Sequence, residues 1–255
     1  MQIKKEELLL VKPFSFAHIC LMLCGACAVY LIWFMLGSRP EESRERFLLI
    51  LCLANIALFV VYKFSLSVDE EFVRISGHEK FNWFNELPLQ LCNINLFLIP
   101  LGILTGNRAI LGFSFFIAPL GAIMALFFPE AAFDGYSLLL PRMTGFYFTH
   151  LLLIVCSISL MTLGFYKPEY ADFPNIIIAF ILLSLGVHFI NIILRHTVCT
   201  FANYFFSFGS NVSILKFFWN ILPIPYMYLL VPALSILSLY MTAVTFCINA
   251  VEQLH

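Results

Sequence analysis

The sequence predicts an all-α membrane protein, a polytopic helical bundle with about seven transmembrane helices. Its composition is the first reason: 62% of the 255 residues are hydrophobic, 11% are charged, and the mean hydropathy is +0.94, far above soluble domains. The second reason is the length of the apolar runs, several of which reach the roughly 20 residues needed to cross hydrocarbon. The sequence contains no evident internal repeat and no segment of clearly different composition, so we expect residues 1–255 to form a single integral membrane domain.

Seven apolar runs divide the chain into spans and connections. The third and fourth runs are separated only by residues 105–108, which favours a short hairpin, with six spans as the alternative. A charged connection follows the first run, an amphipathic one (residues 67–87) follows the second, and a polar, aromatic one (residues 195–223) precedes the last. The predicted spans are residues 16–36, 47–66, 88–104, 109–128, 145–165, 174–194 and 224–248.

The charges exclude one class of partner and favour one orientation. The 14 basic and 15 acidic residues nearly cancel, so no basic surface is available for nucleic acid. With seven spans, most of the basic residues fall on the face that carries the amino terminus, and the positive-inside rule then places that terminus in the cytoplasm. The basic residues on this face are Lys4, Lys5, Lys12, Lys63, Arg74, Lys80, Arg142, Arg195 and Lys216.

Polar side chains gather at one depth of the predicted bundle. The third span, "ELPLQLCNINLFLIPLG" (residues 86–102), enters at Pro88, which places Cys92 about one helical turn inside. The fifth span enters from the same face, the sixth leaves there, and the segment after it can fold back over them. Polar groups in hydrocarbon are costly unless they face a protein interior or water, so we expect a shared cavity. Its predicted lining is Glu86, Gln90, Cys92, Asn95, His150, His188, Asn191 and Asn203.

A cysteine and a histidine in such a cavity are the minimum for nucleophilic acyl transfer. The imidazole takes the thiol proton, the thiolate attacks an ester carbonyl, and a thioester forms. Cys92 and His150 are the candidate catalytic pair, and the amides of Gln90, Asn95, Asn191 or Asn203 are candidates to orient the base or donate to the oxyanion. No cofactor and no metal are expected, because the Cys20, Cys24 and Cys27 stripe has no histidine or acidic partner at ligand spacing.

Two other interpretations stay open on the residues alone. A cysteine in a membrane helix is usually a packing residue, and helix amides often only hydrogen-bond their neighbours. His188 and Asn191, three residues apart on one helix face, fit a structural pair or a proton relay. The alternative function is therefore a transporter or solute-binding protein in which the same cavity is a permeation site and His150 or His188 carries protons.

The third span also resembles a known family. "LPLQLCNINLFLIP" (residues 87–100) resembles the Leu-Pro-Leu-His-Leu-Cys segment of the bacterial YwaF integral membrane family, which is related to the eukaryotic transmembrane protein 164 family. Three further segments match in the same order, so that the resemblance covers roughly residues 47–235. They are "FFPE" (residues 127–130), "FYFTH" (residues 146–150) and "ANYFF" (residues 202–206).

The resemblance implies a function and assigns roles. The eukaryotic members are acyltransferases of glycerophospholipids that use a membrane-embedded cysteine, which implies that Cys92 accepts the acyl group and that His150 is its base. The substrates would be membrane phospholipids or lysophospholipids, and the bacterial branch implies the bacterial cytoplasmic membrane; oligomeric state is not predicted. Gln90 replaces the family histidine and cannot act as a base, and Glu130 replaces an aspartate. The candidate substrate-binding residues are Gln90, Asn95, His188, Asn191, Asn203 and Tyr204.

Overall fold

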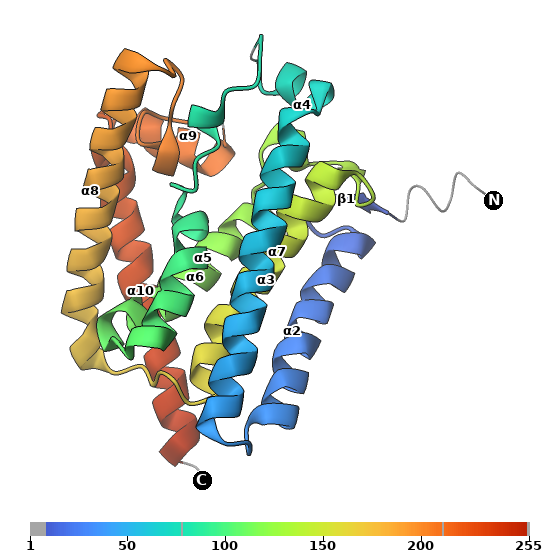
Figure 1. Ribbon diagram of the computed structural model, residues 1–255. Coiled ribbons are helices and arrows are strands. Elements are labelled where there is room, and N and C mark those ends of the chain that lie inside the picture. Colours follow the sequence, from blue (N-terminus) through green and yellow to red (C-terminus); the bar gives the residue numbers. More distant parts are fainter. Residues whose placement is uncertain (1–8, 78, 211, 254–255) are drawn as a thin grey trace. The chain divides into compact units, whose positions relative to one another are not determined.

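A computed structural model describes residues 9–77, 79–210 and 212–253 and confirms the all-α class (Figure 1). Within this part of the chain, six helices are long and apolar enough to cross a membrane, and a seventh apolar helix is shorter. The chain is therefore an integral membrane protein. It divides into two compact units, residues 1–166 and 167–255, which are described separately below. The single domain expected from the sequence stays a prediction.

The first unit consists of five apolar helices and short connecting elements. A two-residue strand pair, β1 (Leu10–Val11) with β2 (Tyr136–Ser137), joins the amino-terminal segment antiparallel to the chain before α7. The 3-10 turns η1 (Trp83–Asn85) and η2 (Ala131–Phe133) lie in the connections before α5 and α7. The five apolar helices are α2 (Phe16–Leu36), α3 (Glu41–Ser67), α5 (Leu91–Thr105), α6 (Arg108–Phe127) and α7 (Pro141–Thr162), and the short helix α4 (Glu70–Ile75) lies between α3 and α5.

The predicted hairpin between the third and fourth runs is confirmed. Helix α5 ends at Gly106, whose φ of +60° is a left-handed conformation that glycine adopts without steric cost. Asn107 then caps α6, because its Oδ1 accepts hydrogen bonds from the backbone nitrogens of Ala109 (3.0 Å) and Ile110 (3.2 Å). With 15 residues, α5 is about 22 Å long, which is shorter than a hydrocarbon layer of about 30 Å.

Helix α7 lies at the centre of the first unit. It packs against α2, α3, α5 and α6, and 72% of its apolar window is buried inside the protein, against 11% for α2. Two glycines allow the close approaches: a Cβ at Gly145 would lie 2.6 Å from Cγ of Tyr62, and one at Gly25 would lie 2.5 Å from Cδ1 of Leu151. Small residues at such contacts are typical of membrane helices, whose association depends on close packing.

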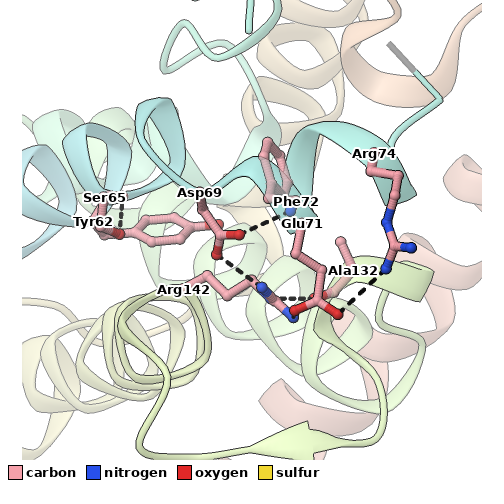
Figure 2. Close-up of polar contacts among 8 residues, drawn as sticks. All are labelled: Tyr62, Ser65, Asp69, Glu71, Phe72, Arg74, Ala132 and Arg142. Carbon is pink, nitrogen blue, oxygen red and sulfur yellow. Dashed lines mark hydrogen bonds and ion pairs between the residues drawn. The ribbon is translucent and has the colours of Figure 1, made fainter. Parts of the chain in front are cut away.

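An arginine fastens the connecting segments to the start of α7. Arg142, with only 1% of its surface exposed, donates to Asp69 Oδ2 (2.8 Å), Glu71 Oε2 (2.9 Å) and the Ala132 carbonyl (3.2 Å), as Figure 2 shows. Asp69 also caps α4 by accepting a hydrogen bond from the Phe72 backbone nitrogen (2.9 Å). The cluster therefore holds α4, η2 and α7 together at the end of the bundle where α3 finishes.

The second unit contains two long helices and an unexpected short one. Its elements are η3 (Tyr170–Asp172), α8 (Phe173–Thr197), η4 (Tyr204–Phe206), α9 (Ser213–Ile221) and α10 (Met227–Gln253). The sequence predicts a connection over residues 195–223, whereas the structure contains helix α9 within this range. In α9, Phe217 and Ile221 are four residues apart and exposed, while the Trp219 ring packs at 5.0 Å on Tyr228. Helical spacing thus separates an outward apolar face from an inward one.

Candidate functional site

Cys92 lies in the first turn of α5, against the middle of α6. The contact is close, because a Cβ added at Gly121 of α6 would be 3.7 Å from the Cys92 backbone nitrogen and 3.9 Å from its Cβ. The side chain is half-buried, and its thiol donates to Asn93 Oδ1 at 3.6 Å. Helix α5 begins at Leu91, directly after Gln90, which occupies the N-cap in extended geometry.

His150 lies on α7 with 7% of its surface exposed, and its hydrogen bond fixes its tautomer. Nδ1 is 2.7 Å from the Phe146 carbonyl oxygen, which can only accept, so Nδ1 carries the proton. The neutral ring then has its lone pair on Nε2, the form required of a general base. The Phe146 ring packs on the imidazole at 4.5 Å between centroids, which holds the ring in place.

The two predicted amide residues of this unit have different environments. Gln90 is half-buried at the N-cap of α5. Asn95 has no exposed surface, and its Nδ2 donates to the Leu91 carbonyl at 2.8 Å. Its Oδ1 has no hydrogen-bond partner among the residues that the structure describes. Asn95 is thus a buried acceptor one turn deeper than Cys92.

Lys63 and Glu86 form an ion pair beside these residues. The sequence predicted Glu86 at the site but did not predict Lys63. Lys63 Nζ lies 2.6 Å from Glu86 Oε2, and the side chains are only 13% and 12% exposed. Lys63 belongs to α3 and Glu86 to the connection before α5, and these two helices pack against each other. Lys63 stands in the last turn of an apolar run, and an ionisable residue there is itself a signal of function.

Glu130 adds a second carboxyl group to this region, in the connection after α6. Burial among protein atoms raises the pKa of Glu130, and the negative charge of Glu86 raises it further, while Lys63 opposes both effects. The residue as a whole is nevertheless exposed.

The other predicted residues belong to the second unit, where two of the amides fasten a loop. Asn191 of α8 donates to the Tyr204 carbonyl (2.7 Å) and to Ser207 Oγ (2.9 Å), and accepts from the Tyr204 backbone nitrogen (2.9 Å). Asn203 donates to the Gly209 carbonyl (2.6 Å) and accepts from the Phe208 nitrogen (2.9 Å). Both amides thus bind loop backbone, which folds residues 199–209 back onto α8.

His188 lies in the same unit between two aromatic rings. Its ring is 5.0 Å from that of Phe208 and 5.4 Å from that of Tyr226. Nδ1 is buried and has no hydrogen-bond partner within the described part of the chain. The predicted meeting of His188, Asn191, Asn203 and Tyr204 with Cys92 and His150 stays a prediction, because the two groups belong to separate units.

Comparison with known proteins assigns the family. The profile of the TMEM164 family matches residues 13–243, which include every predicted site residue and parts of both units. The chain belongs to the TMEM164 family. This confirms the resemblance to the transmembrane protein 164 family found in the sequence. Neither the comparison with curated proteins nor the comparison with solved structures gave a match.

No three His, Cys, Asp or Glu side chains come together as a metal site within residues 9–77, 79–210 and 212–253. The candidate residues of this TMEM164-family protein in the first unit include a thiol at a helix start, an imidazole with its proton on Nδ1 and a largely buried ammonium group. Together they fit nucleophilic chemistry on an uncharged electrophile such as an ester.

Proposed function

We propose that this protein is a membrane-embedded acyltransferase or transacylase that moves a fatty acyl chain between glycerophospholipids through a thioester on Cys92. His150 is the general base and then the general acid. The observation that carries the proposal is the packing of α5, which bears Cys92, against α7, which bears His150, in one compact unit, with the lone pair of His150 on Nε2. The orientation of the amino terminus toward the cytoplasm, a bacterial source and the YwaF relationship belong to the same proposal.

The first half-reaction transfers the acyl group to the protein. His150 Nε2 takes the Sγ proton, and the thiolate attacks the ester carbonyl carbon of the donor lipid. The C–O bond to glycerol breaks, the acyl–sulfur bond forms, and the imidazolium returns its proton to the departing alkoxide. The position of Cys92 in the first turn of α5 supports this step, because the positive end of the helix dipole favours a thiolate.

The second half-reaction releases the acyl group to an acceptor. His150 Nε2 takes the hydroxyl proton of a lysophospholipid, whose oxygen attacks the thioester carbonyl. The C–S bond breaks as the new C–O bond forms, and the proton passes from the imidazolium to Sγ. An apolar surrounding limits water, so transfer to an alcohol is favoured over hydrolysis.

The test is acyl exchange between a labelled phospholipid and a lysophospholipid in vesicles that contain the purified protein. Cys92→Ala and His150→Gln are each expected to lower the exchange rate on the order of 10³-fold or more, because nucleophile and base act as a unit. Mass spectrometry of the wild type given donor lipid alone should find an acyl group on Cys92 that hydroxylamine removes.

A cysteine on the lipid-exposed side of α2 provides the matched control. Cys24→Ala removes a thiol of the same kind from an apolar helix and should leave exchange at the wild-type rate. If Cys92→Ala exchanges acyl chains as the wild type does, or if no acyl group is found on Cys92, the acyltransferase proposal is wrong. Solute transport that persists in Cys92→Ala would then support the permeation alternative, since a thiol is dispensable for solvating a solute.

A further inference from the structure

Helix α9 lies in the connection between two membrane-spanning helices of the second unit. Because α8 ends at Thr197 and α10 begins at Met227, both ends of this connection lie at the same membrane surface. The nine residues of α9 extend about 13 Å, which is too short to cross a hydrocarbon layer of about 30 Å. In Figure 1, α9 lies crosswise to α8 and α10, close to the end of α8 and the start of α10. The helix therefore runs along the membrane surface.

Trp219 fixes the rotation of α9 about its own axis. Its ring lies 5.0 Å from the Tyr228 ring, and a Cβ added at Gly209 would be 3.4 Å from its Cδ2 atom. The hydroxyl group of Tyr228 also donates a hydrogen bond to the Phe206 carbonyl, which joins the start of α10 to the loop beneath α9. The inward face of α9 is therefore defined, and so are the faces that point away from the protein.

The outward side of α9 divides into an apolar face and a polar edge. Phe217 and Ile221, about one turn apart, are 60% and 65% exposed, and Ile224 just after the helix is 50% exposed. Lys216 and Asn220 are also exposed and lie four residues apart, which places them on one common edge beside the apolar face. A helix with one apolar face and a basic polar edge is typical of the boundary between headgroups and acyl chains.

The charges at this end of the second unit are basic. Arg195 and His196 lie in the last turn of α8, and Lys216 lies on α9. Between residues 173 and 251 the sequence contains no Asp or Glu, and the acidic residues of this unit precede α8 or lie at the end of α10. Basic residues at a membrane surface attract anionic phospholipids. The surface beside α9 is therefore complementary to a negatively charged leaflet.

We propose that α9 is an interfacial helix that binds anionic phospholipids. Phe217, Ile221 and Ile224 lie among the upper acyl chains, and Lys216 lies among the headgroups. The occupant follows from position and charge, because the face is exposed at the membrane surface of an integral membrane protein and is bordered by a base without a nearby acidic residue in sequence. This inference goes beyond acyl transfer by Cys92 and does not depend on it.

The test is photocrosslinking of the full-length protein in vesicles made of equal parts of phosphatidylcholine and phosphatidylglycerol. The photoreactive amino acid p-benzoylphenylalanine replaces one residue at a time, and irradiation joins it to a C–H group that it contacts. Mass spectrometry of the labelled peptide then identifies the attached lipid or protein. The replaced residues are Phe217, Ile221, Asn220 and Leu239, of which Leu239 is 73% exposed in the middle of α10 and gives the reference ratio of the two lipids.

The expected result separates the faces of α9 and the two lipids. Probes at Phe217 and Ile221 should carry lipid, whereas the probe at Asn220, on the polar edge, should lose most of this labelling. The ratio of phosphatidylglycerol to phosphatidylcholine at Phe217 should exceed that at Leu239 about two- to fivefold, because a nearby base attracts the anionic lipid. Lys216→Gln should return this ratio to the value at Leu239, and Lys216→Arg should preserve it.

Protein or water in place of lipid would give a different pattern. The inference is overturned if the probe at Phe217 attaches to another segment of this chain or to a second protein, or if it attaches to nothing. A lipid ratio at Phe217 equal to that at Leu239, or one that Lys216→Gln leaves unchanged, also overturns it, since the helix would then not select anionic lipid. Should the Phe217 replacement fail to fold, the same measurements at Ile221 decide.

Discussion

The Arg142 cluster and the Lys63 pair are two charged sites in the same unit that differ in how completely their charges are satisfied. Arg142 donates from Nε, Nη1 and Nη2 to three separate acceptors and lies over the Tyr136 ring at 4.4 Å. Among the described residues, Lys63 pairs with one carboxylate, and its ammonium group also lies over the rings of Phe59 and Tyr62. Both sites join segments that are distant in the chain, the first through three hydrogen bonds and the second through a single ion pair.

The difference follows from the chemistry of the two cations. A guanidinium group is planar, keeps its proton and fits several oxygens at fixed angles, which suits a permanent fastening. An ammonium group is a compact point charge whose field reaches its neighbours without geometric demands. An arginine bound to several acceptors is therefore expected to contribute more to stability than a lysine held by a single ion pair.

Removal of Arg142 should produce the largest loss of stability. Arg142→Met leaves Asp69 and Glu71 without their shared cation, at a cost of about 2–3 kcal/mol. This is less than the roughly 3–5 kcal/mol of a fully buried pair, because both carboxylates partly reach solvent. A thermal unfolding curve in detergent or lipid nanodiscs measures it.

Arg74→Met is the matched control for the same cluster. Arg74 meets Glu71 at 3.8 Å on the surface with 79% of its side chain exposed, so its removal should cost less than about 1 kcal/mol. Equal melting temperatures for Arg142→Met and the wild type would mean that the cluster does not fasten α4 to α7.

A substitution at the helix contact between the two charged sites is expected to have an intermediate effect on stability. Gly145 lies one turn after Arg142 on α7 and against Tyr62, the neighbour of Lys63. Gly145→Ala forces the Tyr62 ring to move and should cost about 1–3 kcal/mol through overpacking. A thermal unfolding curve of the variant in lipid nanodiscs measures this loss.

Gly186→Ala provides the corresponding control in the second unit. An added Cβ there meets nothing within 4 Å, and alanine favours a helix, so stability should hold or rise slightly. If both alanine variants melt at the wild-type temperature, α3 and α7 are not closely packed at Gly145.

The smallest effect concerns the pH dependence of stability at Glu130. Burial and Glu86 raise the pKa of Glu130 above its usual value of 4.5, so the folded state holds the proton more tightly than the unfolded state. That contribution is fully present below pH 4.5 and is lost as pH rises through the folded pKa. Glu130→Gln should therefore melt close to the wild type at about pH 4 and above it at about pH 7.

A surface glutamate separates this effect from a general loss of negative charge. Glu42→Gln removes a side chain that is 83% exposed and paired only with Arg46, so its melting temperature should follow the wild type at both pH values. A Glu130→Gln variant that melts below the wild type at about pH 7 would contradict a raised pKa.

Much of the fold could be predicted from local pattern, with two exceptions that packing explains. The apolar runs became helices, and the hairpin at Gly106 and Asn107 follows from the conformational preference of one residue and the capping side chain of the next. Helix α9 was missed because its apolar residues are mixed with polar ones in a short segment. The pairing of β1 with β2 was missed because two-residue strands depend on the neighbours that align them.

The candidate site could be predicted only in part from the sequence, and the roles that the prediction missed have a physical reason. Cys92 and His150 stood out because reactive side chains are rare in apolar helices. Asn191 stood out for the same reason and Asn203 because its segment could fold back over the spans, yet their hydrogen bonds go mainly to the backbone of residues 204–209. Hydropathy identifies which polar residues must find partners, but it does not distinguish a backbone carbonyl from a reactive neighbour.

By itself, the sequence determined the membrane class, the approximate ends of the spans and the position of Cys92 near the start of a helix, because all three depend on residues adjacent in the chain. The tertiary structure alone decided that Lys63 meets Glu86, 23 residues away, and that Arg142 meets Asp69, 73 residues away. Those contacts depend on which helices approach closely. That choice is made by packing at small residues such as Gly145 and not by hydropathy.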